Sequence, residues 1–373
     1  MKSGKSENFA FSSSSHDARK EFLNLTASFL EAKTYHEAEH RARQLMLFIL
    51  THHDKAQAMA PVLENLNLFE LYGNYNFVKQ RLHYCHQINV FLLGLYIYHN
   101  FEPLRKNITL EMQKTTPEIK IEGCFCPFRY SGGNEYGEFL YRWRLASLCH
   151  DIGTGISLCE RDSSRIAEYL EQIPFEKKVA SVDELSKIGN HDLLQELDAA
   201  CDEVSLSDYM KYQNSHPFPD SVYYDHGIIS ALIFLRLMHE EYGRHGDKTT
   251  SHTRFGCVFW HPKILSNSIL QIAIAIAMHN LEKHPQALQM SAKNIKIFDM
   301  NRRPLAWLLK IADLLQEWDK PRAKNATQKL PVTNLKLEIS DSKISVENFP
   351  NEKRKETLEF LRRYTSPEDI VSI

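Results

Sequence analysis

Histidine and aspartate side chains recur among apolar residues at five places in the chain, where burial is costly unless the group is paired or bound to a cation. The residues are His86, His150 with Asp151, His226, His279 and Asp313. Each shares a helical face with apolar residues, as His86 does with Val90 and Leu93. A lone core histidine is usually structural, but five such coincidences predict one buried metal centre. Mixed imidazole and carboxylate ligands suit iron, manganese, zinc or magnesium.

The dipeptide His-Asp is informative at one position only. It occurs four times, at residues 16, 53, 150 and 191, so the dipeptide alone carries no information. Only His150-Asp151 closes a strongly apolar segment and is followed by Ile-Gly. Phe139, Trp143, Ala146 and His150 are spaced by four, three and four residues, so they share one face of a helix that we expect to point into the core.

The elements that must position these residues are predicted to be helices. Apolar residues recur at helical spacing in segments 43–53, 77–98, 137–151, 225–243, 269–280 and 304–318. Pro304 suits the first turn of the last of them. Residues 160–215 are charge-rich and predict short amphipathic helices, an insertion or lid that we expect to shape access to the site and so to set the substrate.

The spacing of apolar and polar residues changes near the end of the chain. Residues 335–348 alternate apolar and polar side chains around Asp-Ser, which predicts a β-hairpin, and residues 353–364 form a short amphipathic helix pattern. We therefore expect a mainly α fold with a disordered tail at 1–16, a helical domain at 17–329 and a hairpin and helix appendage at 330–373.

Composition excludes several classes of protein. The chain is 43% hydrophobic and 25% charged with a formal net charge of -2, so it has a real core and no strong nucleic-acid or anionic-membrane signal. Its seven cysteines are scattered, which fits free thiols in a reducing compartment. The polar N-terminal segment is no signal peptide, and the apolar runs are too short to span a bilayer. We expect a cytoplasmic protein.

The ordered set of residues resembles the HD superfamily of metal-dependent phosphohydrolases. The pieces that carry the resemblance are RLHYCHQINV, LASLCHDIG and LLKIADLLQEWD, while DHGIISA and AMHN resemble the two additional histidines of binuclear members such as HD-GYP-type phosphodiesterases. The resemblance covers roughly residues 80–320 and implies a helical HD bundle. The HD-GYP signature itself is absent, since Thr154 stands where those enzymes have lysine.

The resemblance implies a ligand set for two divalent ions. Asp151 would bridge them and take a catalytic role, and the first ion would be held by His86, His150, Asp151 and Asp313, the second by His226 and His279. His83 is the alternative to His86, which is preferred because the family pattern has valine four residues later. A transition state with extra negative charge needs nearby cations, for which the candidates are Arg144 and Lys310, together with Arg142 and Arg322.

The expected activity is that of an enzyme, a metal-dependent phosphohydrolase or phosphodiesterase that acts on a small nucleotide-like phosphoester through a metal-activated water. Two alternatives stay open. One is a di-iron oxygenase of the same superfamily, because such members share the six-ligand pattern. The other is a non-catalytic sensor or interaction protein that uses the helical core as a scaffold. The sequence leaves the substrate, the metal, the pathway and a homo-oligomeric state undetermined.

Overall fold

The structure, a computed structural model, describes thirteen stretches of the chain. They are residues 15–51, 83–115, 135–153, 190–201, 204–208, 226–245, 250–253, 256–259, 264–281, 289–290, 293, 296–316 and 336–373. Every structural statement below concerns these residues. The predicted tail therefore lies outside them up to residue 14, as does most of the predicted insertion at 160–215.

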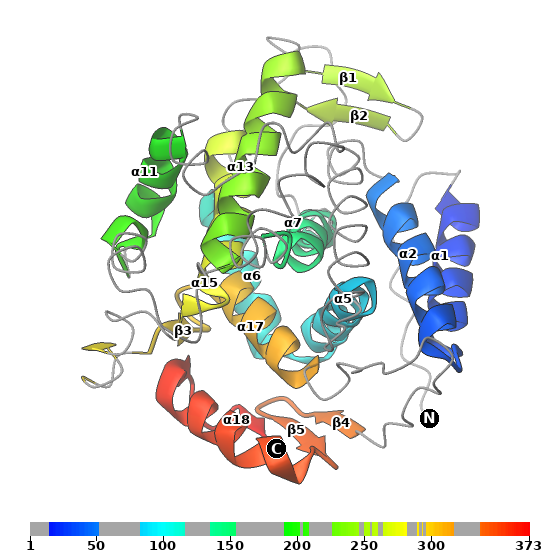
Figure 1. Cartoon of the computed structure of the whole chain (residues 1–373), viewed down its shortest axis with the longest axis vertical. Coiled ribbons are helices and arrows are strands. Elements are labelled where there is room, and N and C mark those ends of the chain that lie inside the picture. Colours follow the sequence, from blue (N-terminus) through cyan, green and yellow to red (C-terminus); the bar gives the residue numbers. More distant parts are fainter. Residues whose placement is uncertain are drawn as a thin grey trace, which may run out of the picture.

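The prediction of a mainly α fold is confirmed, and five helices surround its centre (Figure 1). They are α5 (His83–Asn100), α7 (Glu135–Cys149), α13 (His226–His245), α15 (Leu270–Met278) and α17 (Pro304–Gln316). Helix α15 is the innermost, since all its residues except Gln271 are buried and it packs against α7, α13 and α17. A π-helical segment, η3 (Leu265–Ile269), leads into α15. Helix α5 packs against both α7 and α17.

Helices α5 and α7 approach each other closely because one of them offers a glycine at the crossing. A β-carbon on Gly94 would lie 1.9 Å from the Trp143 ring, so no other residue fits there unless the indole moves. The indole Nε1 of Trp143, which is fully buried, donates a hydrogen bond to the Phe91 carbonyl oxygen at 2.9 Å. The predicted inward face of the 137–151 segment is thus the face that fixes α7 on α5.

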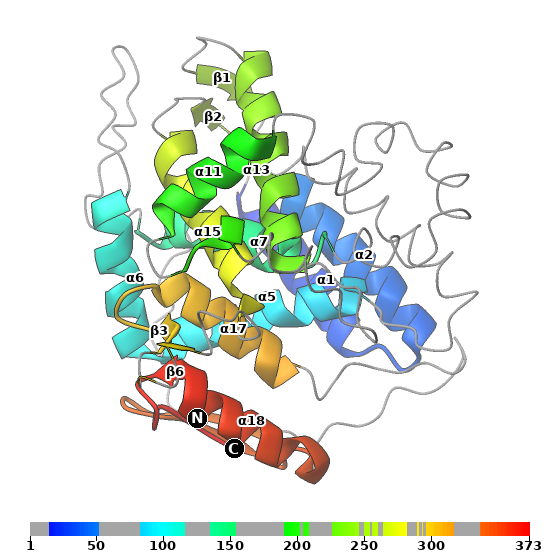
Figure 2. The same ribbon diagram turned by 60° about the vertical axis from the view of Figure 1, so that its left-hand side comes forward.

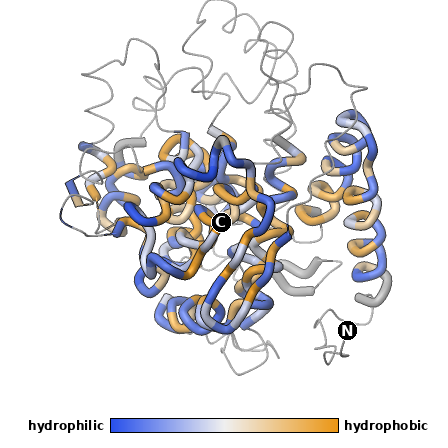
Figure 3. Tube along the Cα trace, turned by 90° about the horizontal axis from the view of Figure 1, so that it is seen from below, coloured by the Kyte–Doolittle hydropathy of each residue, from blue (hydrophilic) through white to orange (hydrophobic). Residues whose placement is uncertain are grey.

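Outer helices cover this centre on several sides. Helices α1 (Ser15–Leu30) and α2 (Tyr35–Thr51) lie side by side, and α2 contacts α5 (Figure 1). Helix α11 (Asn190–Ala200), the part of the predicted insertion that forms a long helix here, packs on α13 and α15. Helix α6 (Glu102–Thr115) and the antiparallel pair β1 (Thr250–Thr253) and β2 (Gly256–Phe259) were not predicted. Both hydrophobic and hydrophilic residues recur along the described part of the chain (Figure 3).

The C-terminal segment forms the predicted hairpin and helix. Strands β4 (Lys336–Ile339) and β5 (Ile344–Glu347) pair antiparallel, and α18 (Asn351–Tyr364) follows them. Two further strands were not predicted: β7 (Val371–Ser372) pairs parallel with β5, and β6 (Thr365–Ser366) pairs parallel with β3 (Phe298–Asp299). The β3–β6 pair joins the appendage to the helical body below α17 (Figure 2), whereas the β5–β7 pair lies within the appendage.

Among the helices that the structure describes, none combines the length and the apolar character that crossing a bilayer requires.

Candidate metal centre

The structure brings together all six side chains that the sequence singled out as metal ligands. Each of the five central helices places one or two of these side chains at, or directly after, one of its ends. His86 lies in the first turn of α5, His150 and Asp151 directly follow α7, and His226 is the first residue of α13. His279 directly follows α15, and Asp313 lies in the last turn of α17. The helical periodicity that predicted inward faces therefore also directs these groups to one place.

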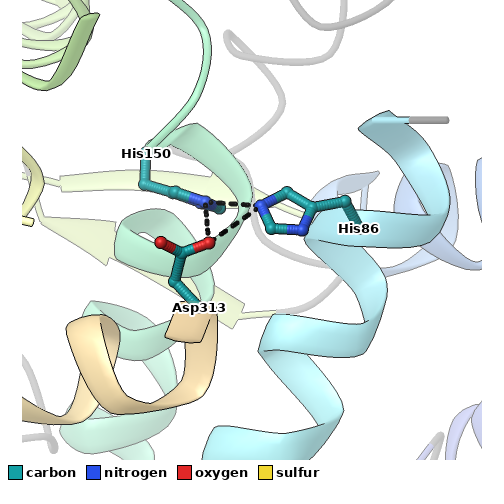
Figure 4. A group of neighbouring side chains, drawn as sticks. All are labelled: His86, His150 and Asp313. Atoms are coloured by element: carbon teal, nitrogen blue, oxygen red, sulfur yellow. Dashed lines mark hydrogen bonds and ion pairs between the residues drawn. The ribbon is translucent and has the colours of Figure 1, made fainter. Parts of the chain in front are cut away.

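One group of ligating atoms consists of His86, His150 and Asp313 (Figure 4). Nε2 of His86 lies 3.1 Å from Nε2 of His150 and 3.3 Å from Oδ1 of Asp313. Nε2 of His150 lies 4.0 Å from the same Asp313 oxygen. The two imidazoles are buried, with 5% and 0% of their surface exposed, and the Asp313 side chain is 15% exposed. Three donors around one point in a dry setting suit a metal ion.

A second group adjoins the first and includes His150, Asp151 and His279. Nε2 of His279 lies 3.6 Å from Oδ1 of Asp151. His226 completes this side, since its Nε2 lies 3.3 Å from the same Asp151 oxygen and 3.3 Å from Nε2 of His279. His226 is the most exposed of the six, with 25% of its side-chain surface accessible.

Asp151 lies between the pair His86 and His150 and the pair His226 and His279, and it turns one oxygen to each pair. Its Oδ2 lies 3.2 Å from Nε2 of His86 and 3.6 Å from Nε2 of His150. Its Oδ1 faces His226 and His279 instead. A carboxylate that divides its oxygens in this way can bind two cations at once, and a second shared ligand would not be needed to hold them close.

The histidines are turned so that Nε2 faces the centre and Nδ1 faces away from it. Nδ1 of His150 donates to the Ser147 carbonyl oxygen at 2.8 Å, and Nδ1 of His279 donates to the Ile276 carbonyl oxygen at 2.6 Å. A carbonyl oxygen only accepts, so the neutral ring keeps its proton on Nδ1 and leaves a lone pair on Nε2. The Nε2 lone pairs and the carboxylate oxygens then face one another, which is unfavourable unless a cation or a proton lies among them.

The protonation behaviour of the centre has identifiable causes. Burial alone would raise the pKa of the Asp151 carboxyl, but its electrostatic interaction with His150 and its side-chain hydrogen bonding with His226, His279 and His86 bring that pKa well below its usual value. Burial lowers the pKa of His150 to about 3, so this ring is neutral. Burial also acts to lower the pKa of His279, yet the hydrogen bond to Asp151 outweighs it and the pKa is raised. Asp151 is therefore a carboxylate at neutral pH.

The predicted cations contact other parts of the molecule. Lys310 is 5% exposed, and its Nζ lies 4.9 Å from the Phe360 ring centroid and 5.9 Å from that of Phe298. Nη1 of Arg144 donates to the Ile49 carbonyl oxygen in the last turn of α2 at 3.1 Å. These contacts are of a packing and helix-capping kind, and the predicted catalytic roles of Lys310 and Arg144 stay predictions.

The remaining candidates are either occupied or outside the described residues. Nε of Arg142, a residue that is 1% exposed, lies 2.7 Å from Oε1 of Glu138, and its Nη1 donates to Thr115 Oγ1 at 2.7 Å. Arg322, Thr154 and the side chain of His83 lie outside the described part of the chain.

Sequence reasoning missed two amide side chains that contact the ligands. Oε1 of Gln316 is hydrogen bonded to Nδ1 of His86. Nδ2 of the Asn280 side chain lies 3.4 Å from Nδ1 of His226. The only signal available beforehand was position, because Gln316 lies three residues after Asp313 and Asn280 directly follows His279.

Comparisons of the chain with protein-family models, with curated proteins and with solved structures found no match.

Proposed function

We propose that this protein is a metal-dependent phosphohydrolase or phosphodiesterase of the HD type, with two divalent ions as its cofactor and a small nucleotide-like phosphoester as its substrate. The proposal combines the sequence resemblance with the geometry of the centre. Six side chains with ligating atoms, in the family's order along the chain, lie in two adjoining groups at the ends of five helices.

The observation that carries the proposal is the position of Asp151 between two pairs of histidines. Its Oδ2 lies 3.2 Å from Nε2 of His86, and its Oδ1 lies 3.3 Å from Nε2 of His226. A buried aspartate with only a structural role needs a cationic side chain or several hydrogen-bond donors around its oxygens. A carboxylate with imidazoles at both oxygens is what a bridged pair of cations requires.

The charge of the donor set favours an anionic substrate. Histidine binds a metal ion in its neutral form, so with two divalent ions bound the two carboxylates supply two negative charges and the ions supply four positive charges. The occupied centre would therefore keep a net positive charge in a largely buried setting, where electrostatic attraction is weakly screened. The anionic oxygens of a phosphoryl group match such a charge.

Within this proposal the roles of the chain's own residues follow from their positions. Bound divalent ions would lower the pKa of a coordinated water and offset charge on the phosphoryl oxygens. Asp151 would hold both ions in one place, and His86, His150 and Asp313 would hold one of them. His226 and His279 would hold the other. The greater exposure of His226 makes its side of the centre the more open to solvent and to a substrate.

Metal analysis followed by a substrate screen tests the proposal. The purified protein is expected to contain up to two divalent ions per chain and, when loaded with Mn²⁺, to hydrolyse bis(p-nitrophenyl) phosphate or members of a panel of nucleotides and cyclic nucleotides. Asp151→Asn should abolish the activity, while Asp341→Asn, in the exposed hairpin turn, should leave it unchanged.

Each alternative has its own result in the same experiment. Bound iron with visible absorption and oxygen consumption, but no phosphoester hydrolysis, would replace the proposal with the di-iron oxygenase. A protein that binds no divalent ion and hydrolyses nothing in the panel would leave only the scaffold hypothesis.

A further inference from the structure

The four histidines of the centre differ in what holds their outward nitrogen. His150 and His279 each follow the end of a helix, and each donates from Nδ1 to the carbonyl oxygen three residues earlier. Carbonyl groups in the last turn of a helix have no partner within the helix, so these two are free to accept. A histidine placed at a helix C-terminus is thus oriented by its own backbone.

His86 cannot be oriented in this way because it lies in the first turn of α5, which begins at His83. The carbonyl groups near it point along the helix and accept hydrogen bonds from residues further on. An acceptor for its Nδ1 must therefore come from another element. The structure supplies one from α17, where Oε1 of Gln316 is hydrogen bonded to Nδ1 of His86.

Gln316 and Asp313 form a pair on the same face of α17. They are three residues apart, a spacing that places two side chains one above the other on a helix. Asp313 Oδ1 lies 3.3 Å from Nε2 of His86, while Gln316 contacts Nδ1 of the same ring. One turn of α17 thus contacts both nitrogens of a histidine from α5.

We infer that Gln316 is a positioning residue that keeps the proton of His86 on Nδ1 and so keeps Nε2 available for a metal ion. This inference rests on the proposed metal centre. Because Gln316 is hydrogen bonded to the His86 ring, we expect its effect on metal binding to pass through that ring.

The burial of Gln316 argues that it is not present for stability. The residue is 2% exposed, and its Nε2 has no hydrogen-bond partner among the described residues. A buried donor without a partner costs on the order of 1–3 kcal/mol, which an apolar side chain of similar size would avoid. The amide is also neutral, so it orients His86 without adding negative charge beside the two carboxylates.

Loss of the amide should affect metal binding more than folding. Without an acceptor at Nδ1, the His86 proton can move to Nε2 and be donated to Oδ2 of Asp151 at 3.2 Å or Oδ1 of Asp313 at 3.3 Å. The N–H group of the His86 ring then still has a hydrogen-bond acceptor in the metal-free protein. A metal ion, however, must now compete with that proton and move it to a nitrogen that has no acceptor.

Three substitutions test the inference by metal affinity. Gln316→Leu should lower the affinity for one Mn²⁺ or Zn²⁺ ion by about 10- to 100-fold, the usual effect of removing such a hydrogen bond. Gln316→Glu should restore it, because a carboxylate also accepts from Nδ1. Gln87→Leu is the matched control, since Gln87 is 3% exposed, follows His86 directly and also has an unpartnered amide atom, Oε1. Melting temperatures of the metal-free variants should lie close to that of the parent.

A nitrogen-15 NMR spectrum of the metal-free parent protein needs no substitution and reads the tautomer directly. The His86 ring should carry its proton on Nδ1 in the parent and in Gln316→Glu. A proton on Nε2 in the parent overturns the inference. An unchanged metal affinity in Gln316→Leu also overturns the inference about Gln316. In that case a parent protein that binds two ions still supports the proposed metal centre. A parent that binds no ion overturns both.

Discussion

The backbone N–H of Gly153 donates a hydrogen bond to the Ser230 hydroxyl oxygen at 2.8 Å, which ties the turn after His150-Asp151 to the first turns of α13. The contact is close because glycine has no side chain. A β-carbon on Gly153 would lie 2.7 Å from the His226 carbonyl oxygen and 2.7 Å from the Ser230 nitrogen. Both neighbours are backbone atoms, so neither can move without displacing α13. The glycine therefore sets the distance between Asp151 and His226.

Gly153→Ala should separate these two ligands. The expected result is destabilisation by about 1–3 kcal/mol, the usual cost of overpacking a close contact, together with loss of the metal ion on the His226 side. Thermal unfolding and metal stoichiometry of the same sample measure both effects. The control is Gly243→Ala in α13, where nothing lies within 4 Å of the added carbon and the helix should gain stability slightly. Full metal content in Gly153→Ala would show that α13 adapts.

The pH dependence of metal binding should differ between the two groups. A proton competes with a metal ion for Nε2. Hydrogen bonding to Asp151, acting against burial, raises the pKa of His279, whereas burial lowers the pKa of His150 to about 3. Acidification should therefore release the ion on the His279 side first. Stepwise metal analysis between about pH 8 and about pH 5, the range in which an ordinary histidine titrates, measures this order.

The same shift predicts opposite pH trends for the metal-free and the metal-loaded protein. The pKa of His279 is higher in the folded protein than its ordinary value of 6.5, so protonation of His279 stabilises the metal-free fold. This stabilisation is complete below pH 6.5. It is lost as the pH rises through the pKa that His279 has in the folded protein. Metal binding instead strengthens as the pH rises. The increase in melting temperature on adding metal should thus grow with pH, and an increase that shrinks with pH would contradict the assignment of His279.

Lys310→Met should lower stability and leave metal content unchanged. The ammonium group lies over Phe360 at 4.9 Å and near Phe298, so it links α17 to the C-terminal helix α18 and to β3. Such cation–π contacts contribute about 0.5–2 kcal/mol. Melting temperature and turnover of the variant decide between two roles. A loss of turnover at an unchanged melting temperature would instead support the catalytic role predicted from sequence.

The clustering of these six residues could be predicted because two simple rules coincided at each residue. Helical periodicity assigns a residue to a face, and an imidazole or carboxylate on an apolar face is conspicuous, as with Asp313 beside Leu309. Arg144 was selected on another ground, that it lies on the helix that leads to His150. Six residues separate the two, which turns them about 120° apart around the helix, so Arg144 faces α2.

Elements that depend on distant parts of the chain were not predictable in the same way. The pairing of β3 with β6 joins residues 298–299 to 365–366. A strand of two residues is too short for its sequence pattern to predict a pairing partner so far along the chain. Gln316 was missed because its role depends on a ring from α5. Helix α6 was missed although Leu104, Ile108 and Met112 are spaced by four, since polar and charged residues together dominate the segment.

The position of Asp151 between the two histidine groups predicts a graded series of metal-site variants. Asp313→Asn should lose the ion on the His86 side only, and His226→Ala the ion on the other side only, because each contacts one group. Asp151→Asn should lose both, since each of its oxygens faces a different group. Elemental analysis of the three proteins under identical conditions gives the stoichiometry.

Turnover and stability should follow the same order. Asp151→Asn keeps the volume of the side chain but loses its charge, so hydrolysis should fall by more than about 10³-fold, the upper range for losing one electrostatic stabiliser. Metal should raise the melting temperature of the parent. For one site, a metal concentration of 100 times Kd adds about 2.7 kcal/mol to the free energy of unfolding. Metal should have no such effect on Asp151→Asn. An Asn variant that binds two ions and hydrolyses substrate at the parent rate would show that Asp151 is a structural acid, and a purely structural acid would lower stability with or without metal.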